Sequence, residues 1–162
     1  MLRICILLCM GASGMAAAED WGPVQFLVGE WHGTGTGGPG DGGGGFSFLP
    51  DLQAKVLVRK SFAEYPAQNG RPAFRHDDLM VVYRESGALR AIYFDSEGHV
   101  IRYGVQAVDG GAAFVSEGGA TGPRYRLTYI REGATAVRFK FEIALPGKDF
   151  QSYIDARLRR NP

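Results

Sequence analysis

A lysine in an otherwise apolar run is the residue of this sequence best placed to bind a charged group. Residues 52–62 alternate in character, and one side of the alternation is Leu52, Ala54, Val56, Val58, Lys60 and Phe62. If that side faces a core, the Lys60 ammonium needs a ligand anion or an internal carboxylate, because burying an unpaired ammonium is costly. A strand bulge that turns Lys60 outward is the alternative, and the residues leave both open.

Three potential metal ligands, Asp95, Glu97 and His99, lie within five residues. A metal site needs converging donors with supporting contacts. A turn in which Asp95 accepts backbone amides and Gly98 takes positive φ accounts better for the same residues. His76-Asp77-Asp78 is interpreted in the same way, as the start of a strand with solvated charges. No metal site is therefore predicted.

Catalysis has no positive signal in the sequence. A hydrolase needs a nucleophile, a base and an oxyanion hole. No serine stands in a GxSxG context, and neither HExxH nor a paired-carboxylate motif occurs; the serines considered are Ser47, Ser61, Ser86, Ser96, Ser116 and Ser152. A linear pattern cannot exclude a site assembled in space, so a role as an enzyme stays open while a non-catalytic role is favoured.

Composition favours one folded domain. The 162 residues carry 18 Lys+Arg against 17 Asp+Glu, a formal charge of +1, and 45% are hydrophobic. This hydrophobic content is far from the regime of intrinsic disorder. The balanced charge argues against nucleic acid as a partner, because a basic surface is what attracts phosphates over distance.

Residues 1–18 are typical of a secretory signal peptide. Arg3 is followed by an apolar run from Ile4 to Met10, and small residues at Ala16 and Ala18 precede an expected cleavage point after Ala18. The apolar run is far shorter than the roughly 20 residues that span a bilayer, so no membrane span is expected. The prediction is a periplasmic or secreted domain over residues 19–162, without Cys5 and Cys9 and hence without a disulfide.

Beyond residue 21 the chain alternates apolar and polar residues, which is typical of β-strands. Val137 to Ile143 shows it best, with apolar odd positions and charged even positions. Ten strands are predicted, near 30–36, 45–49, 52–64, 77–84, 89–95, 99–107, 112–117, 124–131, 136–145 and 151–159. Short Gly- or Asp-containing links make them sequential hairpins. With helix expected only as one turn within Pro23 to Val28, the strands must bury their apolar faces together, as an all-β, antiparallel up-and-down barrel does.

The glycine-rich stretch from Gly37 to Gly45 has two interpretations. It could form a mobile lip at the mouth of the barrel, or it could be a permissive surface connection. The sequence does not choose between these.

Gly29 and Trp31 resemble the GxW signature that opens the first strand of calycins, the group that contains lipocalins and fatty-acid-binding proteins. The continued alternation through Gly33, Gly35 and Gly37 is similar to the start of nitrobindin-like barrels, and the whole chain is similar to secreted bacterial β-barrel domains of unknown function related to them. We expect Trp31 to plug the closed end and the glycines to let a neighbouring strand approach closely.

The nitrobindin resemblance implies haem bound by a histidine near the C-terminal end of the barrel. This chain has no histidine after His99, so only His99 or His76 could replace it. No cofactor is therefore expected, and haem binding is kept as an alternative.

A barrel of ten strands should enclose more space than one of eight, which makes its interior the default binding site. The predicted ligand is a small hydrophobic or amphipathic molecule. The residues expected to contact it are Lys60, Phe62, Tyr93, Tyr103, Tyr125, Tyr129, Phe139 and Phe141. The analogy with fatty-acid-binding relatives would pair Lys60 with an acidic head group. The other alternative is a structural or partner-binding barrel whose rings fill the interior.

Overall fold

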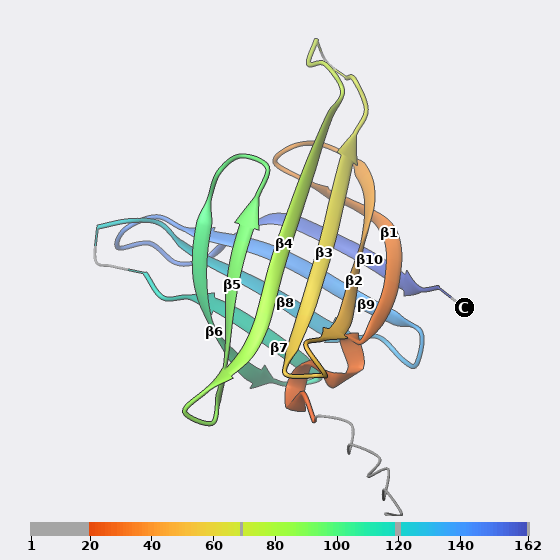
Figure 1. Cartoon of the computed structure of the whole chain (residues 1–162). Helices are drawn as coiled ribbons and strands as arrows, with labels where there is room; N and C mark the ends of the chain where they lie inside the picture. Colours follow the sequence, from red (N-terminus) through yellow and green to blue (C-terminus); the bar gives the residue numbers. More distant parts are fainter. Residues whose placement is uncertain (1–19, 69, 119–120, 162) are drawn as a thin grey trace, which may run out of the picture.

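The computed structural model describes residues 20–68, 70–118 and 121–161 and contains one short helix and ten strands (Figure 1). The predicted signal peptide lies outside the described residues. The elements are η1 (Gly22–Leu27), β1 (Gly29–Gly37), β2 (Gly42–Asp51), β3 (Val56–Tyr65), β4 (Phe74–Glu85), β5 (Ala88–Asp95), β6 (Val100–Val108), β7 (Gly111–Ser116), β8 (Arg124–Arg131), β9 (Ala136–Ala144) and β10 (Gln151–Arg160).

Each strand pairs antiparallel with the next one along the chain, and β1 pairs with β10, so the sheet closes into a barrel. The predicted up-and-down barrel and its helical turn are confirmed. Closure leaves no strand with an unpaired edge, which explains how a chain with so little helix can bury its apolar side chains. The β3–β4 hairpin projects beyond the other strands at the end opposite η1 (Figure 1).

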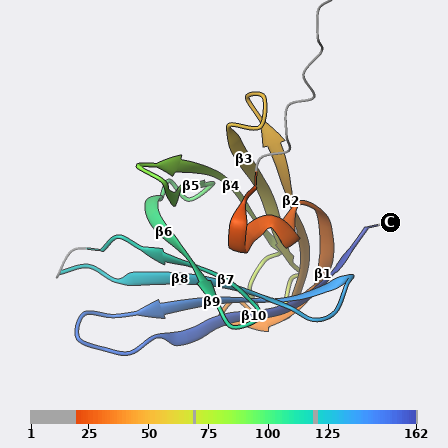
Figure 2. The same ribbon diagram turned by 90° about the horizontal axis from the view of Figure 1, so that it is seen from below.

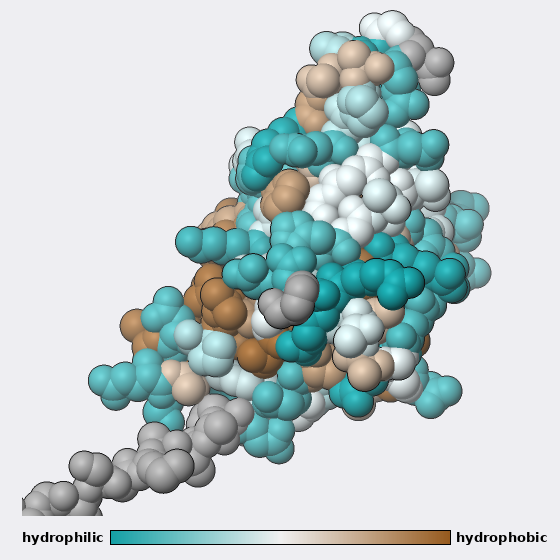
Figure 3. All heavy atoms as spheres, turned by 90° about the vertical axis from the view of Figure 1, so that its right-hand side faces the viewer, coloured by the Kyte–Doolittle hydropathy of each residue, from teal (hydrophilic) through white to brown (hydrophobic). Residues whose placement is uncertain are grey.

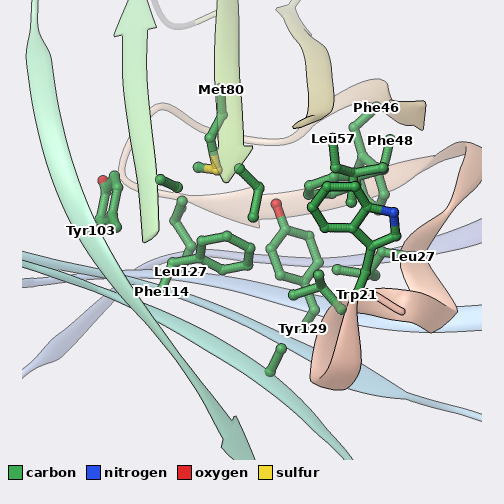
Figure 4. Packing of buried hydrophobic residues seen from close by; sticks show 14 of the residues in the cluster. Trp21, Leu27, Phe46, Phe48, Leu57, Met80, Tyr103, Phe114, Leu127 and Tyr129 are labelled. Atoms are coloured by element: carbon green, nitrogen blue, oxygen red, sulfur yellow. The ribbon is translucent and has the colours of Figure 1, made fainter. Parts of the chain in front are cut away.

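The helix η1 covers one end of the barrel, as the view from below shows (Figure 2). Trp21, directly before η1, and Leu27 of η1 pack against rings from β2, β7 and β8, among them Phe48, Phe114 and Tyr129 (Figure 4). The half of the barrel next to η1 is therefore filled with buried side chains.

Trp31 lies where the sequence predicts it, at this closed end. Its ring is 1% exposed, and its Nε1 donates a hydrogen bond of 2.8 Å to the Leu27 carbonyl oxygen of η1. The guanidinium of Arg160 lies 4.7 Å from the ring centroid. Trp31 thus links η1 to β1 and β10, the two strands whose pairing closes the barrel.

The alternating glycines allow neighbouring strands to approach closely, as predicted. A Cβ on Gly33 would lie 1.9 Å from the Arg157 carbonyl oxygen of β10, and a Cβ on Gly35 would lie 2.7 Å from Ala156 Cβ. No side chain fits at these distances, so glycine at these positions is required by the β1–β10 pairing itself.

Most of the glycine-rich stretch is strand. Gly42 to Gly45 belong to β2 and pair with β1, and Gly43 to Gly45 also pair with β3. The turn between β1 and β2 spans only residues 38–41. The prediction that β2 begins at residue 45 was wrong because glycine lacks the side chain on which the alternation pattern depends.

The outer face over β1, β2 and β10 is mostly hydrophilic (Figure 3). Cross-strand ion pairs hold neighbouring strands on the outside of the barrel, such as Arg126 with Glu142 at 2.7 Å and Arg138 with Asp155 at 2.5 Å. Among the residues that the structure describes, no helix is long and apolar enough to cross a membrane.

Two neighbouring glycines of β2 test the close-approach argument. A Cβ on Gly44 would lie 2.2 Å from the Phe62 carbonyl oxygen, whereas a Cβ on Gly43 would have nothing nearer than 3.7 Å. Gly44→Ala should lower the free energy of unfolding by about 1–3 kcal/mol, because backbone must move to accept the methyl group. Gly43→Ala should leave it unchanged or raise it slightly, since alanine restricts the unfolded chain. Urea unfolding of both variants measures this, and equal effects would contradict the argument.

Candidate ligand-binding site

The half of the barrel away from η1 contains a cavity of about 340 Å³. The charged side chains and histidines of its lining come from β3 to β5 and the β5–β6 turn, whereas the residues that β8 to β10 contribute are aromatic or aliphatic. A smaller cavity of about 80 Å³ shares Arg59, Ser61 and Phe139 with it and extends toward the glycines of β1 and β2. The interior is therefore packed near η1 and hollow toward the β3–β4 hairpin.

An ion pair lies at the inner end of the cavity. Arg59 on β3 hydrogen-bonds through Nη1 to Asp78 Oδ1 on β4, and its Nη2 donates to Ser61 Oγ at 3.0 Å. The side chains of Arg59 and Asp78 are 4% and 7% exposed, and among the described residues Arg59 is the buried charged one. Burial by itself would lower the pKa of Arg59, but Asp78 and the surrounding tyrosine hydroxyls raise it above its ordinary value. Arg59 is thus a cation with its own counterion.

Three tyrosines surround this ion pair. Burial raises the pKa of the Tyr93 and Tyr103 hydroxyls well above the ordinary value, and it raises that of Tyr129 to about 12. The three phenols are therefore neutral at physiological pH and act as hydrogen-bonding groups. Arg59 Nε is buried without a hydrogen-bond partner among the described residues, so the polar floor of the cavity is incompletely satisfied.

Polar contacts continue from the floor toward the open end. His76 on β4 is hydrogen-bonded by both ring nitrogens, through Nε2 to the Tyr93 hydroxyl and through Nδ1 to Glu97 Oε1, each at 3.1 Å. Asp95 Oδ1 accepts the backbone amides of Glu97 and His99, and Gly98 has φ of +90°. The predicted capped turn is confirmed. Its carboxylates nevertheless line the cavity, which the turn interpretation did not anticipate.

The opposite wall is aromatic. Tyr125 stacks on Phe141 with ring centroids 6.0 Å apart, and Tyr153 meets Phe141 edge to face at 5.9 Å. At the open end, Tyr65 stacks on Phe74 at 5.0 Å. Such rings offer a large apolar surface with little side-chain freedom to lose. One wall of the cavity is therefore suited to an apolar body and the other to a polar head.

Five of the eight predicted ligand-contacting residues line this cavity: Tyr93, Tyr103, Tyr125, Phe139 and Phe141. Tyr129 also points inward but lies in the packed part, fully buried (Figure 4). The structure thus brings together the aromatic residues expected to face the interior, while their contact with a ligand stays a prediction.

Lys60 and Phe62 are on the outer face, so their expected inward orientation is wrong. Lys60 is exposed, and the inward series of β3 is Leu57, Arg59, Ser61, Ala63 and Tyr65. No bulge is involved, because β3 pairs in continuous register with both neighbours. The alternation was extended from Leu52 and Ala54, but Leu52 to Ala54 form a turn with positive φ, and β3 begins at Val56.

Sequence reasoning missed Arg59, Asp78 and Tyr153. The charges of Lys60 and Glu64 fall on one side of the β3 alternation and only Arg59 falls on the other, a signal that would have favoured the observed orientation. Asp78 was expected to be solvated with Asp77, yet the two point to opposite faces of β4 and only Asp77 is exposed. Tyr153 reaches the cavity because the β9–β10 register shifts between Ser152 and Ile154, which alternation cannot reveal.

The two histidines considered as alternative haem ligands differ in their contacts. Both ring nitrogens of His76 are hydrogen-bonded, whereas His99 is 54% exposed at the open end with Nδ1 held 2.9 Å from Asp95. Within the described part of the chain, no group of three or more His, Cys, Asp or Glu residues is arranged to hold a metal ion.

No protein-family model and no curated protein matches the chain. Among solved structures, the chain is similar to a de novo designed fluorescence-activating β-barrel, with 13% sequence identity and a TM-score of 0.44; the match covers 85% of this chain and 96% of that one. A likeness at this level carries no argument about function. The closed ten-stranded barrel fits a calycin-like fold, but these comparisons assign the chain to no family.

The buried ion pair makes a stability prediction. Asp78→Ala leaves Arg59 as an uncompensated buried charge and should lower the free energy of unfolding by about 3–5 kcal/mol. The double variant Arg59→Met/Asp78→Leu removes both charges and should recover most of that loss. Asp77→Ala, at the neighbouring exposed position, is the control and should change stability little. Urea unfolding would contradict the prediction if Asp78→Ala behaved like the control.

Asp95 makes a prediction about pH. Burial acts to raise the pKa of Asp95, but hydrogen bonds from His99 and Glu97 and the charge of His99 outweigh it, so the folded-state pKa is lowered. Such a carboxylate stabilises the fold above its unfolded pKa of about 3.9, and the contribution disappears as pH falls through the folded value. Asp95→Asn keeps an acceptor oxygen without the charge. The stability difference between wild type and Asp95→Asn should therefore shrink from about pH 5 to about pH 2 in urea unfolding; a constant difference would refute this.

Proposed function

We propose that this protein binds a small amphipathic molecule reversibly in the hollow half of the barrel. The observation that carries the proposal is the cavity of about 340 Å³ with a polar wall facing an aromatic wall. Its volume falls at the small end of the range for ligand pockets, roughly 300–1,000 Å³. Burial of an apolar body against Tyr125 and Phe141 would supply most of the binding energy, and the polar wall would orient the head group.

The site supports binding better than catalysis. Arg59 and Asp78 are paired with each other, and the equally buried Asp95 carboxylate is held by the backbone amides of its own turn and by His99. The Tyr93 and Tyr103 hydroxyls are neutral. Groups of this kind position a ligand by hydrogen bonds. The alternative of an interior filled by its own rings applies only to the half next to η1, where Phe48, Phe114 and Tyr129 pack together.

A periplasmic or secreted location, with residues 1–18 removed, belongs to the same proposal. A calycin-like relationship belongs to it as well. Both rest on the N-terminal sequence pattern and on the Gly29-x-Trp31 motif at the start of β1.

Filling the cavity tests the proposal. Ile101 on β6 lines the cavity, and its neighbour Arg102 points outward and is exposed. The wild type should increase the fluorescence of the neutral apolar dye N-phenyl-1-naphthylamine. Ile101→Trp should weaken dye binding by about tenfold or more because the indole occupies the space, whereas Arg102→Trp should bind the dye as the wild type does.

Thermal unfolding of both variants establishes that they are folded. Dye binding unaffected by a folded Ile101→Trp protein, or absent from the wild type, would overturn the proposal. Native mass spectrometry of protein purified from its own source provides a second readout, because a carried ligand appears as added mass.

A further inference from the structure

The charges that line the cavity are unbalanced. One guanidinium, that of Arg59, faces three carboxylates, those of Asp78, Asp95 and Glu97. Arg59 and these three carboxylates together carry a net charge of −2, and His76 and His99 lie among them. An occupant with a negative head group would enter a negatively charged space, and a positive head group would be attracted to it.

Arg59 does not compensate this excess, because it is already paired. Asp78 and Ser61 accept the hydrogen bonds of its two terminal nitrogens, and the side chain is 4% exposed. A ligand carboxylate could reach the guanidinium only by displacing Asp78, which would then be a buried charge without a partner. Arg59 is therefore a poor receptor for an acidic head group.

The carboxylates nearer the open end remain in excess after this pairing. Glu97 is 54% exposed, and its Oε1 contacts His76 Nδ1, while Asp95 holds its own turn and His99. Glu97 and Asp95 thus contact histidines, His76 and His99, and among the described residues neither contacts a lysine or an arginine. An ammonium group at the open end would meet Glu97 at the border between solvent and cavity, while Asp95, whose side chain is 4% exposed, adds its negative charge from the same turn.

A further feature makes this a ligand site and not merely a group of acidic residues. Tyr125, Phe141 and Tyr153 form a continuous set of ring contacts on the opposite wall, and aromatic faces attract cations as well as apolar chains. On the floor, Arg59 Nε is buried without a partner among the described residues, and its N–H needs an acceptor that an ordered water can supply and an ammonium cannot.

We propose that the cavity selects positively charged amphipathic amines over neutral or acidic molecules of the same chain length. This inference rests on the proposed function and names its ligand class. The ammonium lies between the carboxylates of the open end and the aromatic wall, and the alkyl or aryl body lies against Tyr125, Phe139 and Phe141.

A matched series of competitors tests this preference. Decylamine, decanol and decanoate share one chain length and differ in head-group charge at neutral pH. Each is titrated against N-phenyl-1-naphthylamine bound to the wild-type protein. Decylammonium should displace the dye at a concentration about tenfold lower than decanoate, with decanol between them. Equal potency, or stronger competition by decanoate, would overturn the ligand class while leaving the proposed function intact; no dye binding at all would overturn both.

A pair of variants locates the origin of the preference. Glu97→Gln removes a carboxylate that lines the cavity in an exposed turn, and it should reduce the ratio between decanoate and decylammonium potencies by about threefold. Glu64→Gln removes a similarly exposed carboxylate from the outer face of β3, where it pairs with Arg75 at 2.5 Å. That control should leave the ratio unchanged. An unchanged ratio in Glu97→Gln, or an equal loss in both variants, would show that the preference does not arise from the cavity carboxylate and would overturn the proposal.

Discussion

The pairing of β1 with β10 is the constraint on which the rest of the molecule depends. It closes the sheet, and closure commits every inward side chain of ten strands to one shared interior. The pairing requires glycine at positions where a Cβ would collide with the neighbouring backbone, as at Gly33. Where β1 carries glycine at alternate strand positions and β2 carries it at successive ones, no side chains are available to fill the adjacent part of the interior. The smaller cavity, which these glycines of β1 and β2 line, therefore has the same origin as the close approach of the strands.

The two halves of that interior bury different kinds of side chain. Next to η1, Trp21, Trp31 and the rings of β2, β7 and β8 exclude water and supply the hydrophobic stabilisation. In the other half, inward positions carry Arg59, Asp78 and His76, which cannot pack into an apolar core without partners. Pairing these groups with one another leaves space between them and the aromatic wall. The cavity is thus a consequence of which residue types face inward beyond the level of Arg59.

Much of this fold could be predicted from the sequence, because alternation with period two is a direct imprint of strands with one buried face. The ten strands and the closed barrel follow from it, whereas the expected role of Trp31 came from the Gly29-x-Trp31 motif. Alternation fails where its reference point is wrong. Leu52, Gln53 and Ala54, which precede β3, adopt positive φ. Extending the alternation through them assigned the side chains of β3 to the wrong faces, so that Lys60 was predicted to point into the barrel where Arg59 does. On β10, the register shift at Tyr153 brings adjacent residues to the same cavity. A shift of one residue reverses every side chain of a strand, so site prediction depends on local backbone details that propensity does not encode.

That Arg59 faces the interior, and not Lys60 as predicted, changes the expected chemistry of the cavity as well as its geometry. A flexible, strongly hydrated ammonium inside the barrel would need an external anion, which is the logic of an acid-binding cavity. A guanidinium presents a planar fork of donors that suits a fixed, buried pair, and here Asp78 and Ser61 occupy that fork. The interior cation is therefore neutralised by the protein itself. What an entering molecule meets is the remainder of the lining, in which Asp95 and Glu97 face aromatic rings with no second lysine or arginine on the described cavity wall to balance them. Because Arg59 and Asp78 neutralise each other, the carboxylates of Asp95 and Glu97 determine the sign of the electrostatic potential in the cavity.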